Sequence, residues 1–296
     1  MFIQQSRAAT PIREYAESTI DDNEGKEKEP EKLFLSALKK SPSDENTHYN
    51  YAKWLRDVQK DHEKAIQHFL LSLKQPTSKD QELVRPLEEK EREMEILNTL
   101  GELYQFEDSF DLGEAEGCYQ MALSVNHNHI DTLYNYAKFL EFRASTQFDD
   151  DVRASDFEEA ESVFQNILKL DPNHIKTLYA YGILYEHFHK DHDKCEEMHK
   201  KILEIDPHHT ETLLHYGVFL HEIRNDEEAA EAKYKEVLEL DPNNVTATYN
   251  YACLKRDTNN DEEAEKLFHK ALDIDPGHVP TLGSFGTFLH DFKGQD

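Results

Sequence analysis

The sequence predicts an all-α protein made of about six stacked helix pairs, and three observations support this. Its 296 residues include only 10 glycines and 10 prolines, few for a chain with many tight turns. Apolar residues recur at helical spacing, without the alternation of strands. The chain also aligns with itself, as two segments show: TLLHYGVFLHEIRNDEEAAEAKYKEVLELDPNN from Thr212 and TATYNYACLKRDTNNDEEAEKLFHKALDIDPGH from Thr246.

The first helix of each unit is marked by a small residue that follows an aromatic residue or a leucine. We call this place the anchor position, and it is held by Ala52, Gly101, Ala137, Gly182, Gly217, Ala252 and Gly286. The last three intervals between anchors are 35, 35 and 34 residues. Two helices approach closely only where one side chain is nearly absent, so each anchor is expected at a close helix contact.

The second helix of each unit carries another small residue and, four residues later, a ring. The small residues are Ala65, Ala115, Ala160, Cys195, Ala230 and Ala264. The place of the ring, which we call the ring position, is held by Phe69, Tyr119, Phe164, His199, Tyr234 and Phe268. A proline then ends most units, at Pro76, Pro172, Pro207, Pro242 and Pro276, and His127 holds this place in the second unit.

These recurring offsets resemble the tetratricopeptide repeat, a pair of antiparallel helices with a period of about 34 residues. The resemblance covers residues 31–296 and implies a right-handed α-solenoid with repeats at about 45–76, 94–128, 130–173, 175–209, 210–244 and 245–278. Residues 31–40 and 279–292 are expected to be orphan helices that cap the two ends, because stacked repeats must cover their terminal apolar faces. Residues 1–30, with the charged stretch DDNEGKEKEP, are expected to form a flexible arm.

Two segments interrupt the regular spacing. The charged segment 78–93 separates the first and second repeats and is expected to extend the following helix at its start. The segment 143–157 separates the two helices of the third repeat, and we expect it to form a loop that makes contacts.

Charge and composition restrict the partner classes. A formal net charge of −28 opposes binding to nucleic acid phosphates and anionic membranes and favours basic protein segments. Three widely separated cysteines are typical of a reducing compartment, so we expect a cytoplasmic protein without membrane insertion. The alternative is the interior of an organelle, if residues 1–13, which contain two arginines and no acid, act as a targeting segment.

The resemblance implies a concave groove lined by the first helices, at residues six and three before each anchor and one and four after it. Among the repeats these positions carry five basic and six acidic residues, a net charge of −1. Tyrosines give contact area with few rotors, and an asparagine amide can pair with an extended peptide backbone. The alternative is that both residue types only support helix packing. The candidate peptide-binding residues are Tyr49, Asn50, Lys53, Arg56, Asn98, Tyr134, Asn135, Lys138, Lys176, Tyr179, Tyr249, Asn250 and Arg256.

Chemical sites are sparse in this sequence. The run from His187 to Lys200 places His192, Cys195 and His199 at spacings that a metal could use, and they are weak candidates, because Cys195 and His199 also hold packing positions. No motif for phosphate binding or nucleophilic catalysis occurs, so we expect neither an active site nor a cofactor. Histidines just before first helices, at His129, His174, His209 and His278, are expected to help start those helices.

These observations predict an adaptor or scaffold, not an enzyme. Its groove and inserts would hold a protein or peptide within a larger assembly. One alternative is a fixed architectural subunit of a multiprotein complex. A remote alternative is a metal-linked regulatory protein built on the fourth repeat.

Overall fold

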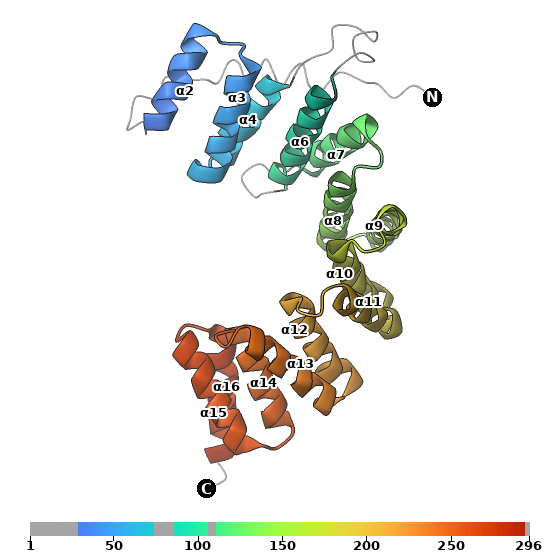
Figure 1. Cartoon of the computed structure of the whole chain (residues 1–296), viewed down its shortest axis with the longest axis vertical. Helices are drawn as coiled ribbons and strands as arrows, with labels where there is room; N and C mark the ends of the chain where they lie inside the picture. Colours follow the sequence, from blue (N-terminus) through green and yellow to red (C-terminus); the bar gives the residue numbers. More distant parts are fainter. Residues whose placement is uncertain (1–28, 74–85, 106–110, 294–296) are drawn as a thin grey trace. The chain divides into compact units, whose positions relative to one another are not determined.

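The computed structural model describes residues 29–73, 86–105 and 111–293, and within these ranges it contains helices and turns but no strand (Figure 1). The fold class predicted from the sequence is confirmed. The predicted arm lies outside the described residues, apart from the first turn of α2, and so do residues 78–85. The chain forms two compact units, residues 1–163 and 164–296.

The first unit pairs α3 with α4, α6 with α7, and α8 with the first part of α9. A further helix, α2, packs on α3 through Phe34, Leu35 and Leu38, which is the capping place predicted for residues 31–40. In chain order the elements are α2 (Glu29–Lys40), α3 (Glu45–Trp54), η1 (Leu55–Gln59), α4 (His62–Ser72), α6 (Leu87–Leu103), α7 (Leu112–Val125), α8 (Ile130–Thr146) and α9 (Asp150–Leu170).

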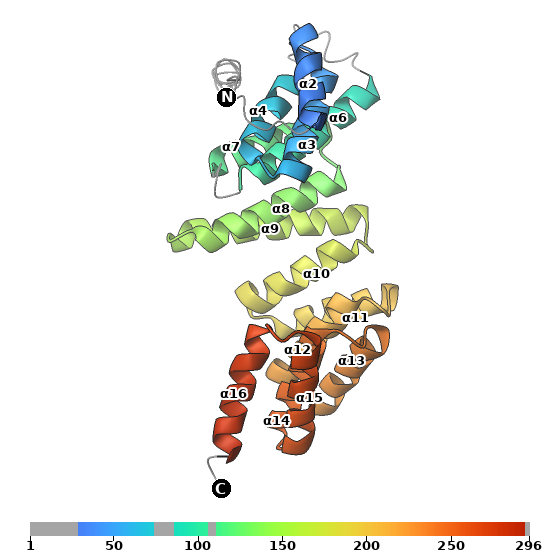
Figure 2. The same cartoon turned by 90° about the vertical axis from the view of Figure 1, so that its left-hand side faces the viewer.

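The second unit pairs α10 with α11, α12 with α13, and α14 with α15, and α16 covers the final pair (Figure 2). Phe285 and Phe288 of α16 pack on Phe268 of α15, so the last helix closes the apolar core. In chain order the elements are α10 (Ile175–Leu184), η3 (Tyr185–His189), α11 (His192–Ile205), α12 (Thr210–Phe219), η4 (Leu220–Arg224), α13 (Glu227–Leu240), α14 (Val245–Asp257), α15 (Asp261–Ile274) and α16 (Val279–Lys293).

The 35-residue repeats end their first helix in a π-helical turn. In the fourth and fifth repeats this turn is η3 or η4, whereas α14 of the 34-residue repeat ends without one. Each turn is closed by a residue in the left-handed region, Lys190 at φ 55° or Asn225 at φ 53°. The next residue is an aspartate whose side chain accepts a hydrogen bond from the first turn of the second helix. The extra residue of the longer repeats is thus absorbed in the π turn.

First helices begin at a histidine in several repeats, as the sequence predicted. His129 and His209 are N-cap residues, and the Nδ1 atom of each accepts a hydrogen bond from the backbone of a threonine three residues later. In all four histidine repeats Nδ1 also lies within 2.9 Å of that threonine's hydroxyl oxygen. The threonine is completely buried in each repeat, so its hydroxyl needs this partner.

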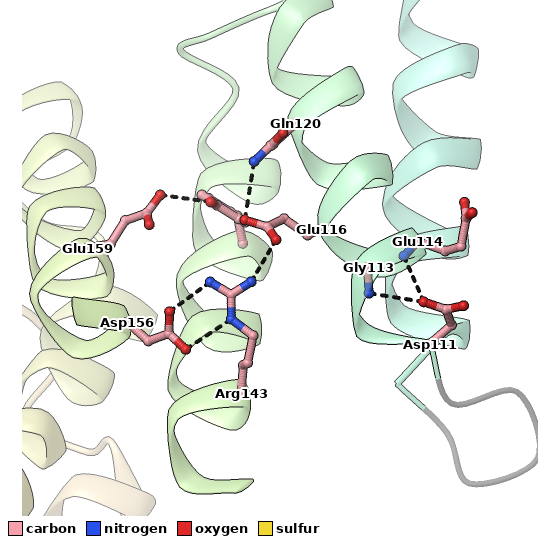
Figure 3. A network of polar contacts seen from close by, with 9 residues as sticks. Asp111, Gly113, Glu114, Glu116, Gln120, Arg143, Asp156 and Glu159 are labelled. Carbon is pink, nitrogen blue, oxygen red and sulfur yellow. Dashed lines mark hydrogen bonds and ion pairs between the residues drawn. The ribbon is translucent and has the colours of Figure 1, made fainter. Parts of the chain in front are cut away.

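The segment 143–157 is helical apart from residues 147–149, and the prediction of a loop over its length is wrong. Helix α8 continues to Thr146 and α9 already begins at Asp150. Arg143 explains the extension (Figure 3). Its guanidinium donates hydrogen bonds of 2.9 and 2.7 Å to the buried Asp156 carboxylate and one of 2.6 Å to Glu116 of α7. By contrast, the prediction that the segment 78–93 extends the helix that follows it is confirmed for residues 87–93, since α6 starts at Leu87.

Candidate functional site

A pocket with a volume of about 770 Å³ lies in the first unit. One face of α6 forms most of its lining, and residues of η1 and of the α7–α8 joint complete it. Of the candidate peptide-binding residues, Arg56 and Asn98 line this pocket, and Glu95, Glu102 and Asp131 hold other predicted groove positions there. Its residues are Arg56, Leu87, Lys90, Glu91, Met94, Glu95, Asn98, Thr99, Glu102, Val125, Asn126, His129 and Asp131.

The pocket lining is acidic. It carries four carboxylates and two cations, a net charge of −2. Arg56 is partly engaged, because it pairs with Asp57 and donates a hydrogen bond of 3.2 Å to the Thr99 hydroxyl. Glu95 lies 3.3 Å from the Lys53 ammonium at the pocket edge. The surrounding protein raises the pKa of Glu102 by desolvation, although this side chain is reachable from the pocket.

Of the predicted amides, Asn98 lines the pocket, and Asn135 contacts the pocket residue Glu102. Asn98 donates a bond of 2.8 Å to the Thr132 hydroxyl, while its Oδ1 atom has no hydrogen-bond partner among the described residues. Asn135 donates a bond of 2.9 Å to Glu102 and thereby links α8 to α6. Asn50, on α3, is exposed.

The four predicted tyrosines do not line the pocket, and each already has intramolecular contacts. In the first unit, Tyr49 lies under the Arg92 guanidinium, 4.5 Å from its ring centroid, and Tyr134 is half-buried. In the second unit, Tyr179 packs edge-on against His215, and the Tyr249 hydroxyl lies 3.0 Å from that of Ser284. These contacts favour the packing role for the tyrosines.

The remaining predicted groove residues differ in their surroundings. Lys138 pairs with Glu141 on its own helix, and Arg256 pairs with its neighbour Asp257. Lys176 is exposed at the start of α10, and Asn250 is half-buried on α14. Of these four, none lines the pocket of the first unit.

A second cluster lies in the second unit, where α10, η3, α11 and α12 meet. Glu186, His199 and His215 each offer one ligand atom, and these atoms lie within 4.8 Å of one another. His199 Nε2 is 3.2 Å from His215 Nδ1, and the Cys195 sulfur is 3.6 Å from both His199 Nε2 and Glu186 Oε2. His199 and Cys195 are completely buried, and Glu186 and His215 are partly accessible.

Burial keeps the cluster's cysteine and His199 neutral. Desolvation, and next the nearby Glu186, raises the pKa of Cys195 to about 12. Desolvation, and next His215, lowers the pKa of His199 to about 3. Desolvation also lowers the pKa of His215. His199 Nδ1 is buried without a hydrogen-bond partner among the described residues.

The predicted metal candidate His192 is not a member of this group. It lies at the start of α11 with its ring 6.1 Å from that of Phe219. Glu186 and His215 take part instead. Spacing along one helix could not identify them, since they come from a π turn and from the next repeat.

Residues 224–283 match the family model described as the tetratricopeptide repeat. This part of the chain is therefore similar in sequence to the tetratricopeptide-repeat family. No curated protein matches its sequence.

Two solved structures share the fold of this repeat protein at low sequence identity. A tetratricopeptide repeat protein from Parabacteroides merdae is 14% identical, and the match covers 95% of this chain and 98% of that chain with a TM-score of 0.59. PilF of Pseudomonas aeruginosa is 15% identical, with 82% and 97% covered and a TM-score of 0.57. At these identities the likeness establishes the fold alone.

Among the described residues, none of the repeat helices combines the length and apolar character needed to cross a membrane. At the pocket, sequence reasoning missed Leu87, Lys90 and Glu91, and also Met94, Thr99, Val125, Asn126 and His129. The first three lie on the N-terminal extension of α6, before the repeat that the pattern predicts at residues 94–128. The signal for them was the length of the charged segment 78–93.

Proposed function

We propose that this repeat protein is an adaptor that holds a segment of another protein in the pocket of its first unit. The observation that supports this most directly is that three consecutive repeats together line the pocket. The first repeat supplies η1, the second supplies α6, and the joint with the third supplies the far wall. Stacked repeats offer such composite surfaces to their partners. The volume of about 770 Å³ suits several side chains of a bound segment.

The charge of the pocket favours a basic segment. A lysine or arginine side chain that reached Glu102 would compensate a carboxylate that is now partly desolvated. Glu91 and Asp131 extend the negative surface on either side, and the chain's net charge of −28 attracts the same partners at longer range. Backbone recognition would involve Asn98, whose Oδ1 atom can accept a hydrogen bond after a small movement of the amide.

A peptide display library selected on the full chain tests this proposal. We expect the enriched peptides to be rich in lysine and arginine. Fluorescence polarisation with one enriched peptide should then show saturable binding that weakens about tenfold or more in Glu102→Lys, because a carboxylate is replaced by a like charge.

The matched control is Glu63→Lys, which makes the same charge change at an exposed site on α4. Its affinity should stay within about twofold of that of the unchanged protein, since distant exposed charges are screened. Equal weakening in both variants would mean that only the overall charge attracts the peptide. Enrichment of acidic or neutral peptides would contradict the proposed partner class.

The alternative of a fixed architectural subunit is supported by Phe148, between α8 and α9. Its side chain is fully exposed, and Val152 on the next turn is exposed as well. Together the two side chains offer a small hydrophobic contact to another chain. Phe148→Ser should leave helix content and thermal stability unchanged. If the protein is a subunit, it should also shift the protein from a large complex to monomer size in size-exclusion chromatography of a native extract.

A further inference from the structure

The fourth and fifth repeats depart from the pattern of the other repeats at three positions that meet in space. The small residue of the second helix is alanine in every other repeat and Cys195 here. The ring position is phenylalanine or tyrosine in every other repeat and His199 here. Two residues before the anchor, three repeats carry asparagine, as in Asn135 and Asn250, whereas the fifth carries His215. All three changes introduce a side chain that binds transition metals.

The fourth donor comes from the π turn. Glu186 lies in η3, and its Oε2 atom is 3.6 Å from the Cys195 sulfur and 3.8 Å from His215 Nε2. The interface between α10–α11 and α12 therefore collects two imidazoles, a thiol and a carboxylate.

Two of the separations between these donors agree with tetrahedral coordination. Zinc bonds of about 2.0–2.3 Å place neighbouring nitrogen ligands about 3.3 Å apart, and a nitrogen and a sulfur about 3.6 Å apart. The observed separations are 3.2 Å for His199 Nε2 to His215 Nδ1, and 3.6 Å for the Cys195 sulfur to His199 Nε2. Glu186 supplies a ligand atom within 4.8 Å of both histidine donors, which small side-chain rotations can shorten.

Packing alone accounts poorly for the same substitutions. The His199 ring is completely buried, and its Nδ1 atom lacks a hydrogen-bond partner among the described residues. A buried polar atom without a partner is unfavourable compared with the phenyl ring that other repeats place there. The His199 ring also does not fill the space beside the Gly182 anchor. The atom nearest to a Cβ added at Gly182 would be one of Met198, at 3.3 Å. The imidazole contacts Cys195 and His215 instead.

From these observations we propose that Glu186, Cys195, His199 and His215 bind one divalent transition-metal ion, with zinc as the expected ion. The mixed nitrogen, sulfur and oxygen donors suit a borderline metal and not calcium or magnesium. The ion would join the α10–α11 pair to α12, so it would strengthen the interface between two neighbouring repeats. Glu186 and His215, which are partly accessible, give the ion a route to the buried donors.

Cobalt provides the spectroscopic test, because Co²⁺ reports zinc-like sites by colour. Full-length protein freed of metal by a chelator is titrated with Co²⁺. We expect one equivalent to give the intense visible bands of four-coordinate cobalt, together with a thiolate-to-cobalt band from Cys195. Added Zn²⁺ should displace the colour. Zn²⁺ alone should raise the unfolding temperature of the metal-free protein.

The other repeats supply variants that keep the packing. Cys195→Ala, His199→Tyr and His215→Asn each introduce the residue type that other repeats carry at that position. His215→Asn should weaken cobalt binding about tenfold or more, and the triple variant should show neither the visible bands nor the zinc-dependent rise in unfolding temperature. Circular dichroism confirms that each variant is folded.

His208→Ala, which removes an exposed histidine before α12, is the control and should bind cobalt as tightly as the unchanged protein. Absence of stoichiometric binding in the unchanged protein overturns the proposal. Binding of equal strength in the triple variant overturns it as well, because other histidines would then be the ligands.

Discussion

Gly217 lies directly against the ring of Tyr234. A Cβ atom added at Gly217 would be 2.7 Å from Tyr234 Cε1, and one added at Gly101 would be 2.7 Å from Tyr119 Cζ. Repeats with a glycine anchor carry tyrosine at the ring position, or His199 in the fourth repeat, whereas repeats with an alanine anchor carry phenylalanine. Outside the fourth repeat, the size of the anchor and the identity of the ring are therefore matched.

We expect Gly217→Ala to lower the free energy of unfolding by about 1–3 kcal/mol, because the methyl group overpacks the contact with Tyr234. This loss should exceed the gain that alanine normally brings to a helix. Thermal and denaturant unfolding followed by circular dichroism measure it. The double variant Gly217→Ala with Tyr234→Phe reproduces the alanine–phenylalanine pair of other repeats and should recover part of the loss.

Gly286 provides the opposite case. It holds the anchor position of α16, and nothing lies within 4 Å of a Cβ added there. Gly286→Ala should therefore raise the free energy of unfolding by about 0.5–1 kcal/mol through helix propensity alone. A similar gain at Gly217 would show that the ring of Tyr234 does not restrict the anchor.

Arg143→Met should destabilise the first unit by about 3–5 kcal/mol. The substitution leaves the carboxylate of Asp156, which is 4% exposed, without its ion-pair partner. Denaturant unfolding followed by the fluorescence of Trp54, the single tryptophan, reports on this unit. The double variant Arg143→Met with Asp156→Leu should regain most of the stability, since no unpaired charge stays buried. A loss of less than about 1 kcal/mol in the single variant would instead place this pair with ordinary exposed salt bridges.

The sequence predicts the features that each repeat determines locally. The anchors, rings and helix starts recur at fixed offsets, so Gly217, Tyr234 and the N-cap His209 could be assigned from the repeat alone. Arg143 and Asp156 could not, because their ion pair replaces the predicted loop with two longer helices and depends on contact between them. The proposed metal cluster shows the same limit, since the sequence pattern indicates Cys195 and His199 on one helix but not His215, which belongs to the next repeat.

A buried histidine pair should make the first unit sensitive to acid. His48 and His68 are 3% and 5% exposed, and their Nδ1 atoms are 2.8 Å apart. His48 Nε2 donates to the Pro42 carbonyl, so its Nδ1 accepts and His68 Nδ1 donates. Desolvation lowers the pKa of His68 to about 4, with further lowering by His48 and Lys64 and a small opposing effect of Asp61.

The folded-state pKa of His68 is below the unfolded value of about 6.5, so the unfolded chain takes up the proton first. The contribution of neutral His68 to the free energy of unfolding is therefore complete above about pH 6.5. It is lost as the pH falls to about 4, and the total loss is about 3 kcal/mol. Trp54 fluorescence during denaturant unfolding at several pH values measures this loss. His68→Phe should give a flatter pH dependence in that window, while His208→Asn, at an exposed site, should match the unchanged protein. Parallel pH profiles for all three proteins would contradict the assignment to His68.

The residue that closes η1 should also limit the stability of the first unit. Lys60 is exposed and has a φ of 58°, a left-handed conformation that costs a residue with a side chain about 1 kcal/mol relative to glycine. Lys60→Gly should therefore raise the free energy of unfolding by up to about 1 kcal/mol, as followed by Trp54 fluorescence. Lys60→Ala is the control, because it removes the same charge and side chain but keeps the Cβ atom. Equal gains in the two variants would show that the lysine charge, and not the backbone conformation, is the source of the effect.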